Sequence, residues 1–320
     1  VSEELGVDTS AGAAVDLNKG SGEMMLRHST SDINDCRNSL GIFGTMSFIQ
    51  EAASRHDIQT LEYRTDAQYQ GLRSFLGSAA AHAADINGMV RSLRKGLAGK
   101  GAALDELDKV HMRMTYTRDP AAPQLIIKEF EENGPSVEGV IKVDKKAGET
   151  VLAGELGPYP GPVKARVVTR VVKNWFLSVA PTLSVVRPLG YIIPGARTDI
   201  VENLIGLGVE VFIVEADSPL RVEAYRVKDI KPAAGDYLAP DKLDVEVLEQ
   251  GTVVRKGDFY VRCSQAAADL VPCLLEPQSA YGLIRYWKFR LVPETGDIFP
   301  IYRVVAGPGL RTVPYKNWGR

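Results

Sequence analysis

The chain has 320 residues, of which 45% are hydrophobic and 24% are charged, a composition typical of globular proteins of two or three domains. Its 38 Lys and Arg against 40 Asp and Glu leave a net charge of −2, so no basic excess indicates a nucleic-acid partner. The sequence contains no apolar run long enough to span a membrane. Three cysteines are too few for a disulfide scaffold. Cys263 and Cys273 either pair in an oxidising compartment or are buried free thiols.

The N-terminal residues 1–27 are rich in Gly, Ser, Ala and Asp and predict a loop. Residues 45–51 (TMSFIQE) then predict a short strand that ends in Glu51 and follows a polar approach at residues 28–42. A strand end beside a cleft is a common place for a catalytic carboxylate, because the scaffold fixes the group and substrate can still reach it. The alternative is that Glu51 only marks the solvated end of the strand.

A single long helix is predicted from about residue 65 to residue 97. Apolar side chains recur there at steps of three and four, which places them on one face of a helix. The alanines around residue 80 would let this face lie close against a sheet. The apolar positions are Tyr69, Leu72, Leu76, Ala79, Ala83, Ile86, Val90, Leu93 and Leu97.

Frequent Gly and Pro residues after residue 105 separate short β-branched runs, which indicates an antiparallel sheet or sandwich. Residues 190–214 predict a strand, a helix that ends at Gly206 or Gly208, and a second strand, as in a βαβ unit. Residues 281–290 alternate aromatic and charged side chains, which favours a strand over a platform for carbohydrate or peptide. Further strands are predicted at 125–127, 140–143, 165–172, 220–227, 245–248 and 259–263, and a short helix at 266–275.

The run from His28 to Ala52 (HSTSDINDCRNSLGIFGTMSFIQEA) resembles the last part of the catalytic domain in the zinc carboxypeptidase (carboxypeptidase A-like) family. In that family a Gly-Ile or Gly-Leu turn leads into a strand of the form S-F-x-x-E, and the Glu is the general base and acid. Gly41-Ile42 and the S-F-I-Q-E run at 47–51 match this pattern. The resemblance covers about the first hundred residues. A looser likeness to accessory domains of some bacterial members continues to the C-terminus.

The resemblance implies roles for four residues. Glu51 would be the general base and acid, and His28 would stand near the position of a mobile Tyr that binds substrate in the family, or be an ordinary loop histidine. Asp35 and Arg37 would line the specificity pocket, where Arg37 favours an acidic substrate side chain and Asp35 a basic one. The alternative is that Asp35 and Arg37 form a pair that stabilises their own loop.

The resemblance also implies a zinc ion held by two His and one Glu. None of the four histidines of the chain is followed by Glu three positions later, so the H-x-x-E part of such a site is missing. We therefore expect the zinc ligands outside this chain, either in a longer enzyme or in a second polypeptide. The start at Val1 rather than Met favours a fragment, and a sheet without its partner strands would expose an edge to another chain.

Together these observations predict an α/β fold in which residues 1–105 are part of a carboxypeptidase-like α/β/α domain. An antiparallel β domain at 106–185 and a small mixed domain at 186–320 follow. The expected function is zinc-dependent removal of C-terminal residues from a peptide or protein substrate. The alternative is a non-catalytic binding or structural protein on the same fold. Secretion or a periplasmic location is implied by the resemblance alone.

Overall fold

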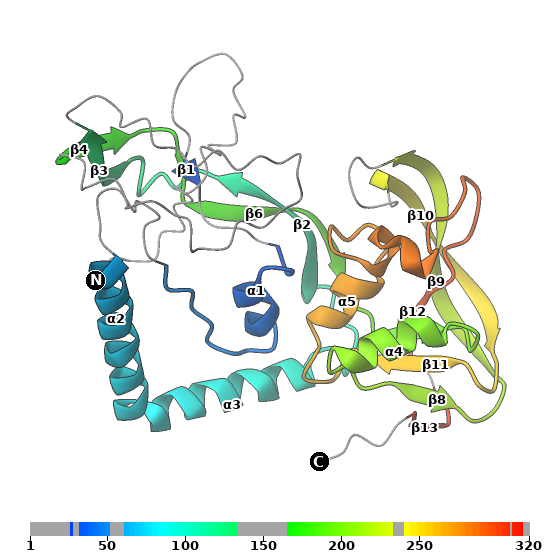
Figure 1. Ribbon diagram of the computed structural model, residues 1–320. Coiled ribbons are helices and arrows are strands. Elements are labelled where there is room, and N and C mark those ends of the chain that lie inside the picture. The colour runs from blue at the N-terminus through cyan, green and yellow to red at the C-terminus, as the bar shows by residue number, and fades with distance from the viewer. Residues whose placement is uncertain are drawn as a thin grey trace, which may run out of the picture. The chain divides into compact units, whose positions relative to one another are not determined.

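The computed structural model describes residues 26–27, 32–51, 61–132, 165–232, 240–307 and 309–315 (Figure 1). The chain forms two compact units, each assembled from separate stretches of sequence. Unit 1 consists of residues 1–29, 49–83 and 116–179, and unit 2 of residues 30–48, 84–115 and 180–320. The predicted domain boundaries at 105 and 185 stay a prediction.

Unit 2 contains a seven-stranded sheet in which every neighbouring pair of strands is antiparallel. The strand order is β10-β9-β12-β7-β11-β8-β13. The strands are β7 (Gly190–Ile193), β8 (Phe212–Val214), β9 (Ser218–Pro232), β10 (Pro240–Val254), β11 (Phe259–Arg262), β12 (Tyr302–Val304) and β13 (Thr312–Pro314). The strands predicted near residues 190, 212, 220, 245 and 259 are all present in this sheet.

Strands β7 and β8 are joined by helix α4 (Thr198–Gly206), so the predicted strand–helix–strand unit is confirmed. Both strands pair antiparallel with β11, which lies between them. The helix ends as the sequence indicates. Gly208 takes a left-handed conformation (φ +83°), and the N–H groups of Gly208 and Val209 donate to the carbonyls of Ile205 and Leu204 at 2.9 and 3.0 Å. These two bonds form a Schellman motif, which satisfies carbonyls that a helix end leaves open.

The main core of unit 2 lies between the sheet, α4 and a second helix, α5 (Leu270–Leu275). One face of α4 is completely buried, because Ile200, Val201 and Leu204 are each 0% exposed. Burial of such a side chain contributes about 1.5–3 kcal/mol. Burial in this core therefore contributes a large share of the stability of unit 2.

The predicted strand at 281–290 is wrong. The segment instead forms two short 3-10 helices, η1 (Leu283–Arg285) and η2 (Trp287–Phe289). Leu283, Ile284 and Phe289 are buried, whereas Trp287 is 60% exposed. Leu283 and Ile284 both pack into the main core of unit 2, so the segment does not present one aromatic row to the core and one charged row to solvent, as the predicted strand would.

Three two-stranded ladders complete the described strands. They are β1 (Leu26–Arg27) with β5 (Trp175–Phe176), β2 (Lys109–Thr117) with β6 (Ser178–Val186), and β3 (Leu125–Glu132) with β4 (Ala165–Val172). The predicted strands at 125–127 and 165–172 are confirmed as the antiparallel pair β3–β4. The predicted strand at 140–143 lies outside the described residues.

The predicted long helix is present as two helices, α2 (Leu61–Ala81) and α3 (Ala83–Gly99), with His82 between them. Tyr69, Leu72 and Leu76 on the predicted apolar face of α2 are 53–58% exposed. The described residues therefore do not cover this face with a sheet. Within the described part, no helix is both long and apolar enough to cross a membrane.

These elements show a mixed arrangement of helices and strands with one large antiparallel sheet. The carboxypeptidase-like α/β/α layering predicted for residues 1–105 is not confirmed.

Candidate active site

The segment that carries Glu51 is not a strand. A short helix, α1 (Cys36–Gly41), and a turn at residues 42–44 precede it, and residues 45–51 have no regular secondary structure. Met46 and Phe48 are 43% and 57% exposed. A strand needs a neighbour for its backbone N–H and C=O groups, and no described strand pairs with this segment. The predicted strand is therefore wrong, although Glu51 is exposed and open to solvent.

Side-chain contacts hold this segment in place of a sheet. At its start, in unit 2, the Arg94 guanidinium on α3 donates to the Phe43 carbonyl at 3.2 Å and to Thr45 Oγ1 at 3.0 Å. Gly44 has a left-handed φ of +67°, and a Cβ there would lie 2.8 Å from a methyl of Leu93. At its end, in unit 1, Gln50 Nε2 donates to the Gln68 carbonyl on α2 at 3.0 Å. Glu51 thus follows a residue whose side chain is anchored.

Asp35 is the N-cap of α1. Its Oδ1 accepts a hydrogen bond from the Arg37 backbone N–H at 3.0 Å, and Arg37 Nε lies 4.0 Å from the same oxygen. A carboxylate at this position satisfies a donor that the helix start leaves open. The geometry agrees with the sequence-based alternative that the two residues stabilise their own loop. Both belong to unit 2, whereas Glu51 belongs to unit 1.

The remaining predicted site residue, His28, lies outside the described residues. So does His56. Of the other histidines, His82 separates α2 from α3, and His111 Nδ1 lies 2.9 Å from Ser184 Oγ on the neighbouring strand β6. Among the described residues, no three His, Cys, Asp or Glu side chains come together as metal ligands would. The described residues therefore do not fit a zinc site.

Sequence reasoning missed a buried ionic network around Glu276. This residue is 1% exposed, and its carboxylate accepts hydrogen bonds from Tyr191 Oη at 2.7 Å and Tyr225 Oη at 2.6 Å. Arg303 Nε lies 3.0 Å from Glu276 Oε1, and the same guanidinium pairs with Glu223. Burial, together with the Glu276 charge, raises the pKa of both tyrosines above their ordinary value. Such a network is closed to substrate and holds β7, β9 and β12 to the end of α5.

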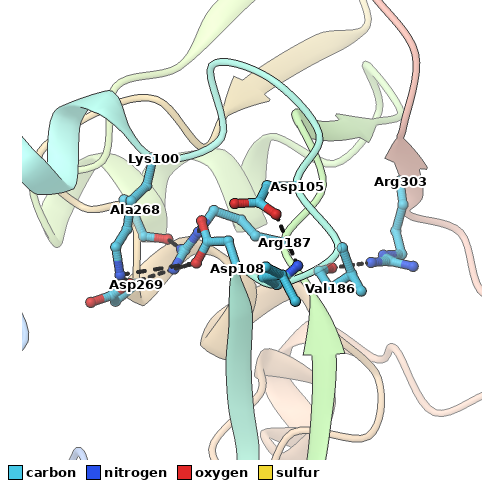
Figure 2. Close-up of polar contacts among 9 residues, drawn as sticks. Lys100, Asp105, Asp108, Val186, Arg187, Ala268, Asp269 and Arg303 are labelled. Carbon is cyan, nitrogen blue, oxygen red and sulfur yellow. Dashed lines mark hydrogen bonds and ion pairs between the residues drawn. The ribbon is translucent and has the colours of Figure 1, made fainter.

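A second buried arginine, Arg187, joins four elements of unit 2 (Figure 2). It follows β6 and is 1% exposed. Its guanidinium donates to Asp108 Oδ2 at 2.8 Å and to Asp269 Oδ1 at 2.7 Å, and Lys100 Nζ lies 3.6 Å from Asp269. The hydrogen bond from Arg187 holds the pKa of Asp108 below its ordinary value. Every charge here has an opposite partner, so the cluster fixes the ends of α3, β2, β6 and α5.

The turn after α3 reaches this cluster because residue 101 is glycine. Gly101 has a φ of +69°, and a Cβ at this position would lie 2.6 Å from Cys263 Cβ. Cys263 and Cys273 are both free and buried. Burial raises the pKa of both thiols, to about 12 for Cys273. These cysteines are therefore unreactive core residues.

The sequence could have pointed to Glu276 in one respect. The residue interrupts an apolar run (LVPCLLEP, residues 270–277), and a carboxylate inside such a run needs buried partners. Those partners, Tyr191 and Tyr225, lie 85 and 51 positions away along the chain. The sequence pattern alone does not identify them.

The sequence has a weak similarity to one known peptidase. The chain is 30% identical over 132 residues to Carboxypeptidase 2 of Trichophyton rubrum. The matched region is 39% of this chain and 23% of that protein, so the chain spans less than a quarter of the length of the relative it matches. No family model matches the chain, and no solved structure matches it. The similarity indicates a carboxypeptidase-like relationship and nothing more specific.

Proposed function

We propose that this chain takes part in hydrolysis of peptides from their C-terminal end, with Glu51 as the group that moves protons. The observation that carries the proposal is the similarity to Carboxypeptidase 2. The geometry supports it, because Glu51 is exposed at the end of a segment that side chains anchor at both ends.

In this reaction the Glu51 carboxylate takes a proton from water as the water oxygen bonds to the carbonyl carbon of the scissile peptide. The same proton then passes to the leaving amine as the C–N bond breaks, which regenerates the carboxylate. General acid–base catalysis of this kind contributes about 10²- to 10⁴-fold in rate. Zinc would belong to the active assembly with ligands outside this chain, because none of the four histidines is followed by Glu three positions later.

Substrate contacts of His28, Asp35 and Arg37 belong to the same proposal. For Asp35 the capping bond to the Arg37 N–H means that a substitution would also weaken α1. A change of specificity on Arg37→Ala, which keeps the Asp35 cap, is therefore the cleaner test of the proposed substrate contact.

The test compares the native full-length protein with its Glu51→Gln variant. The assay measures release of the C-terminal amino acid from a peptide with a free carboxylate and from the same peptide as its amide. We expect activity on the free acid alone, and a loss of at least about 100-fold in kcat for Glu51→Gln. Glu62→Gln, at an exposed glutamate in the first turn of α2, is the matched control and should keep full activity.

Activity that survives Glu51→Gln would refute the role of Glu51. A wild-type protein that binds the peptide but releases no amino acid in the presence of zinc would support the non-catalytic alternative. That alternative is motivated by the missing H-x-x-E pattern in the sequence.

A further inference from the structure

The residue before Glu51 is fixed to helix α2 by a contact that requires a glycine. Gln50 Nε2 donates to the Gln68 carbonyl at 3.0 Å. A helix carbonyl has two lone pairs, so Gln68 can accept this bond in addition to its bond within the helix. One helical turn along, Gly71 leaves the space that the Gln50 amide fills.

The presence of glycine at position 71 is explained by the contact with Gln50 and not by the stability of the helix. A Cβ at this position would lie 2.3 Å from Gln50 Nε2 and 2.8 Å from Gln50 Cδ. Glycine inside a helix is destabilising relative to alanine. Gly77 lies six residues later in the same helix, and a Cβ there would meet nothing within 4 Å. The two glycines therefore differ in whether a side chain would displace Gln50.

We propose that Gln50 is a positioning residue for Glu51, and that Gly71 is the socket for its side chain. The inference rests on the function proposed above. Residues 45–51 have no regular secondary structure, so a sheet does not fix the backbone at Glu51. The Gln50 side chain fixes it instead, because the planar peptide between residues 50 and 51 couples their backbones. A carboxylate that is displaced by about 1 Å loses up to about 100-fold in rate.

Gly71→Ala tests the socket, and Gly77→Ala is its matched control. Both substitutions put alanine in place of glycine in α2, so both should slow hydrogen exchange in this helix. The new methyl at position 71 should displace the flexible Gln50 side chain and lower kcat about threefold to tenfold with an unchanged KM. The contact lies at the surface, where water competes for the bond, so the loss is partial. Gly77→Ala should leave kcat unchanged.

A general loss of structure cannot give this result, since Gly71→Ala is expected to make the helix more stable while it lowers kcat. Gln50→Ala should lower kcat to a similar extent. In the Gln50→Ala background, Gly71→Ala should have no further effect, because the side chain that it displaces is already absent.

The outcomes separate this inference from the proposed function. If Glu51→Gln abolishes activity while Gln50→Ala and Gly71→Ala both retain the kcat of the wild type, the socket is refuted and the role of Glu51 stands. Additive losses in the double variant would also refute the socket. If Glu51→Gln retains activity, the proposed function fails whatever the other variants show.

Discussion

The seven-stranded sheet of unit 2 and the segment that carries Glu51 are held by different kinds of interaction. The sheet has strand ladders on both sides of β7, a continuous apolar core and the buried Arg303, which pairs with Glu276. Elsewhere in unit 2 the buried Arg187 pairs with Asp108. Residues 45–51 have no ladder and depend on surface contacts of Arg94 and Gln50. The comparison indicates that stability is concentrated in unit 2, whereas the proposed chemistry depends on a few side chains outside that sheet.

Loss of the Glu276 charge should give the largest effect on the sheet. Glu276→Gln keeps the size of the side chain but leaves Arg303 buried without one of its two carboxylate partners. Removal of one partner from a buried ion pair costs about 3–5 kcal/mol. Hydrogen exchange in β7 and β12 should report a loss of this size, and exchange in α2 should not change.

The control for this prediction is Arg303→Met in the Glu276→Gln background. Because the buried guanidinium that lost a carboxylate partner is then gone, the double variant should recover part of the lost free energy of unfolding. A cost below about 1 kcal/mol for Glu276→Gln would show that the network is not what holds these strands together.

The contrast between the two regions also explains which sequence-based predictions succeeded. Five of the seven strands in the unit 2 sheet (β7–β11) and helix α4 were predicted, because burial leaves an apolar pattern between Gly and Pro breakers. Strands β12 and β13 were not predicted. Gly208 ends α4 through a local bond pattern that the sequence carries within a few residues. Local sequence patterns were sufficient for these elements.

The strand predicted to end at Glu51 is wrong because the contacts that decide its conformation come from residues distant in sequence. The T-M-S-F-I run has the composition of a strand, but no described strand pairs with it. Its contacts come from Arg94 and Gln68, which lie 49 and 18 positions from their partners Thr45 and Gln50. Glu276 was missed for the same reason. A pattern within ten residues does not contain contacts of this range.

An intermediate effect is expected at Asp108, and it should depend on pH. Asp108→Asn weakens the hydrogen bond to Arg187, at a cost of about 1.5–3 kcal/mol at neutral pH. The folded pKa of Asp108 is lowered from its ordinary value of 3.8, so the unfolded chain takes up the proton first as the pH falls. The extra stability of the wild type over Asp108→Asn should therefore be complete above the ordinary pKa. It should decline below that pKa and be lost as the pH falls through the lowered folded pKa.

Urea unfolding of the wild type and Asp108→Asn at about pH 6 and about pH 3 measures this dependence. Asp244→Asn is the matched control, since Asp244 is 63% exposed and lies 4.0 Å from Lys228. The unfolding free energies of the wild type and of Asp108→Asn should be closer to each other at the lower pH than at the higher pH. An unchanged difference would mean that the charge of Asp108 does not contribute to the Arg187 cluster.

The smallest effect is expected for the surface ion pairs of the β9–β10 ladder. Glu246 lies directly opposite Arg226, with Nη1 and Oε2 3.5 Å apart, and both side chains are 49% exposed. Exposed pairs of this kind contribute less than about 1 kcal/mol, so Glu246→Gln should barely change hydrogen exchange in β9 and β10. A cost equal to that of Glu276→Gln would contradict the argument, because both variants remove one carboxylate from an arginine in the same sheet. Burial is the variable that separates the two sites. If Glu246→Gln and Glu276→Gln cost the same free energy of unfolding, the stability of the sheet would depend on its ion pairs whether or not they are buried. Burial would then not explain why the sheet is more stable than the segment that carries Glu51.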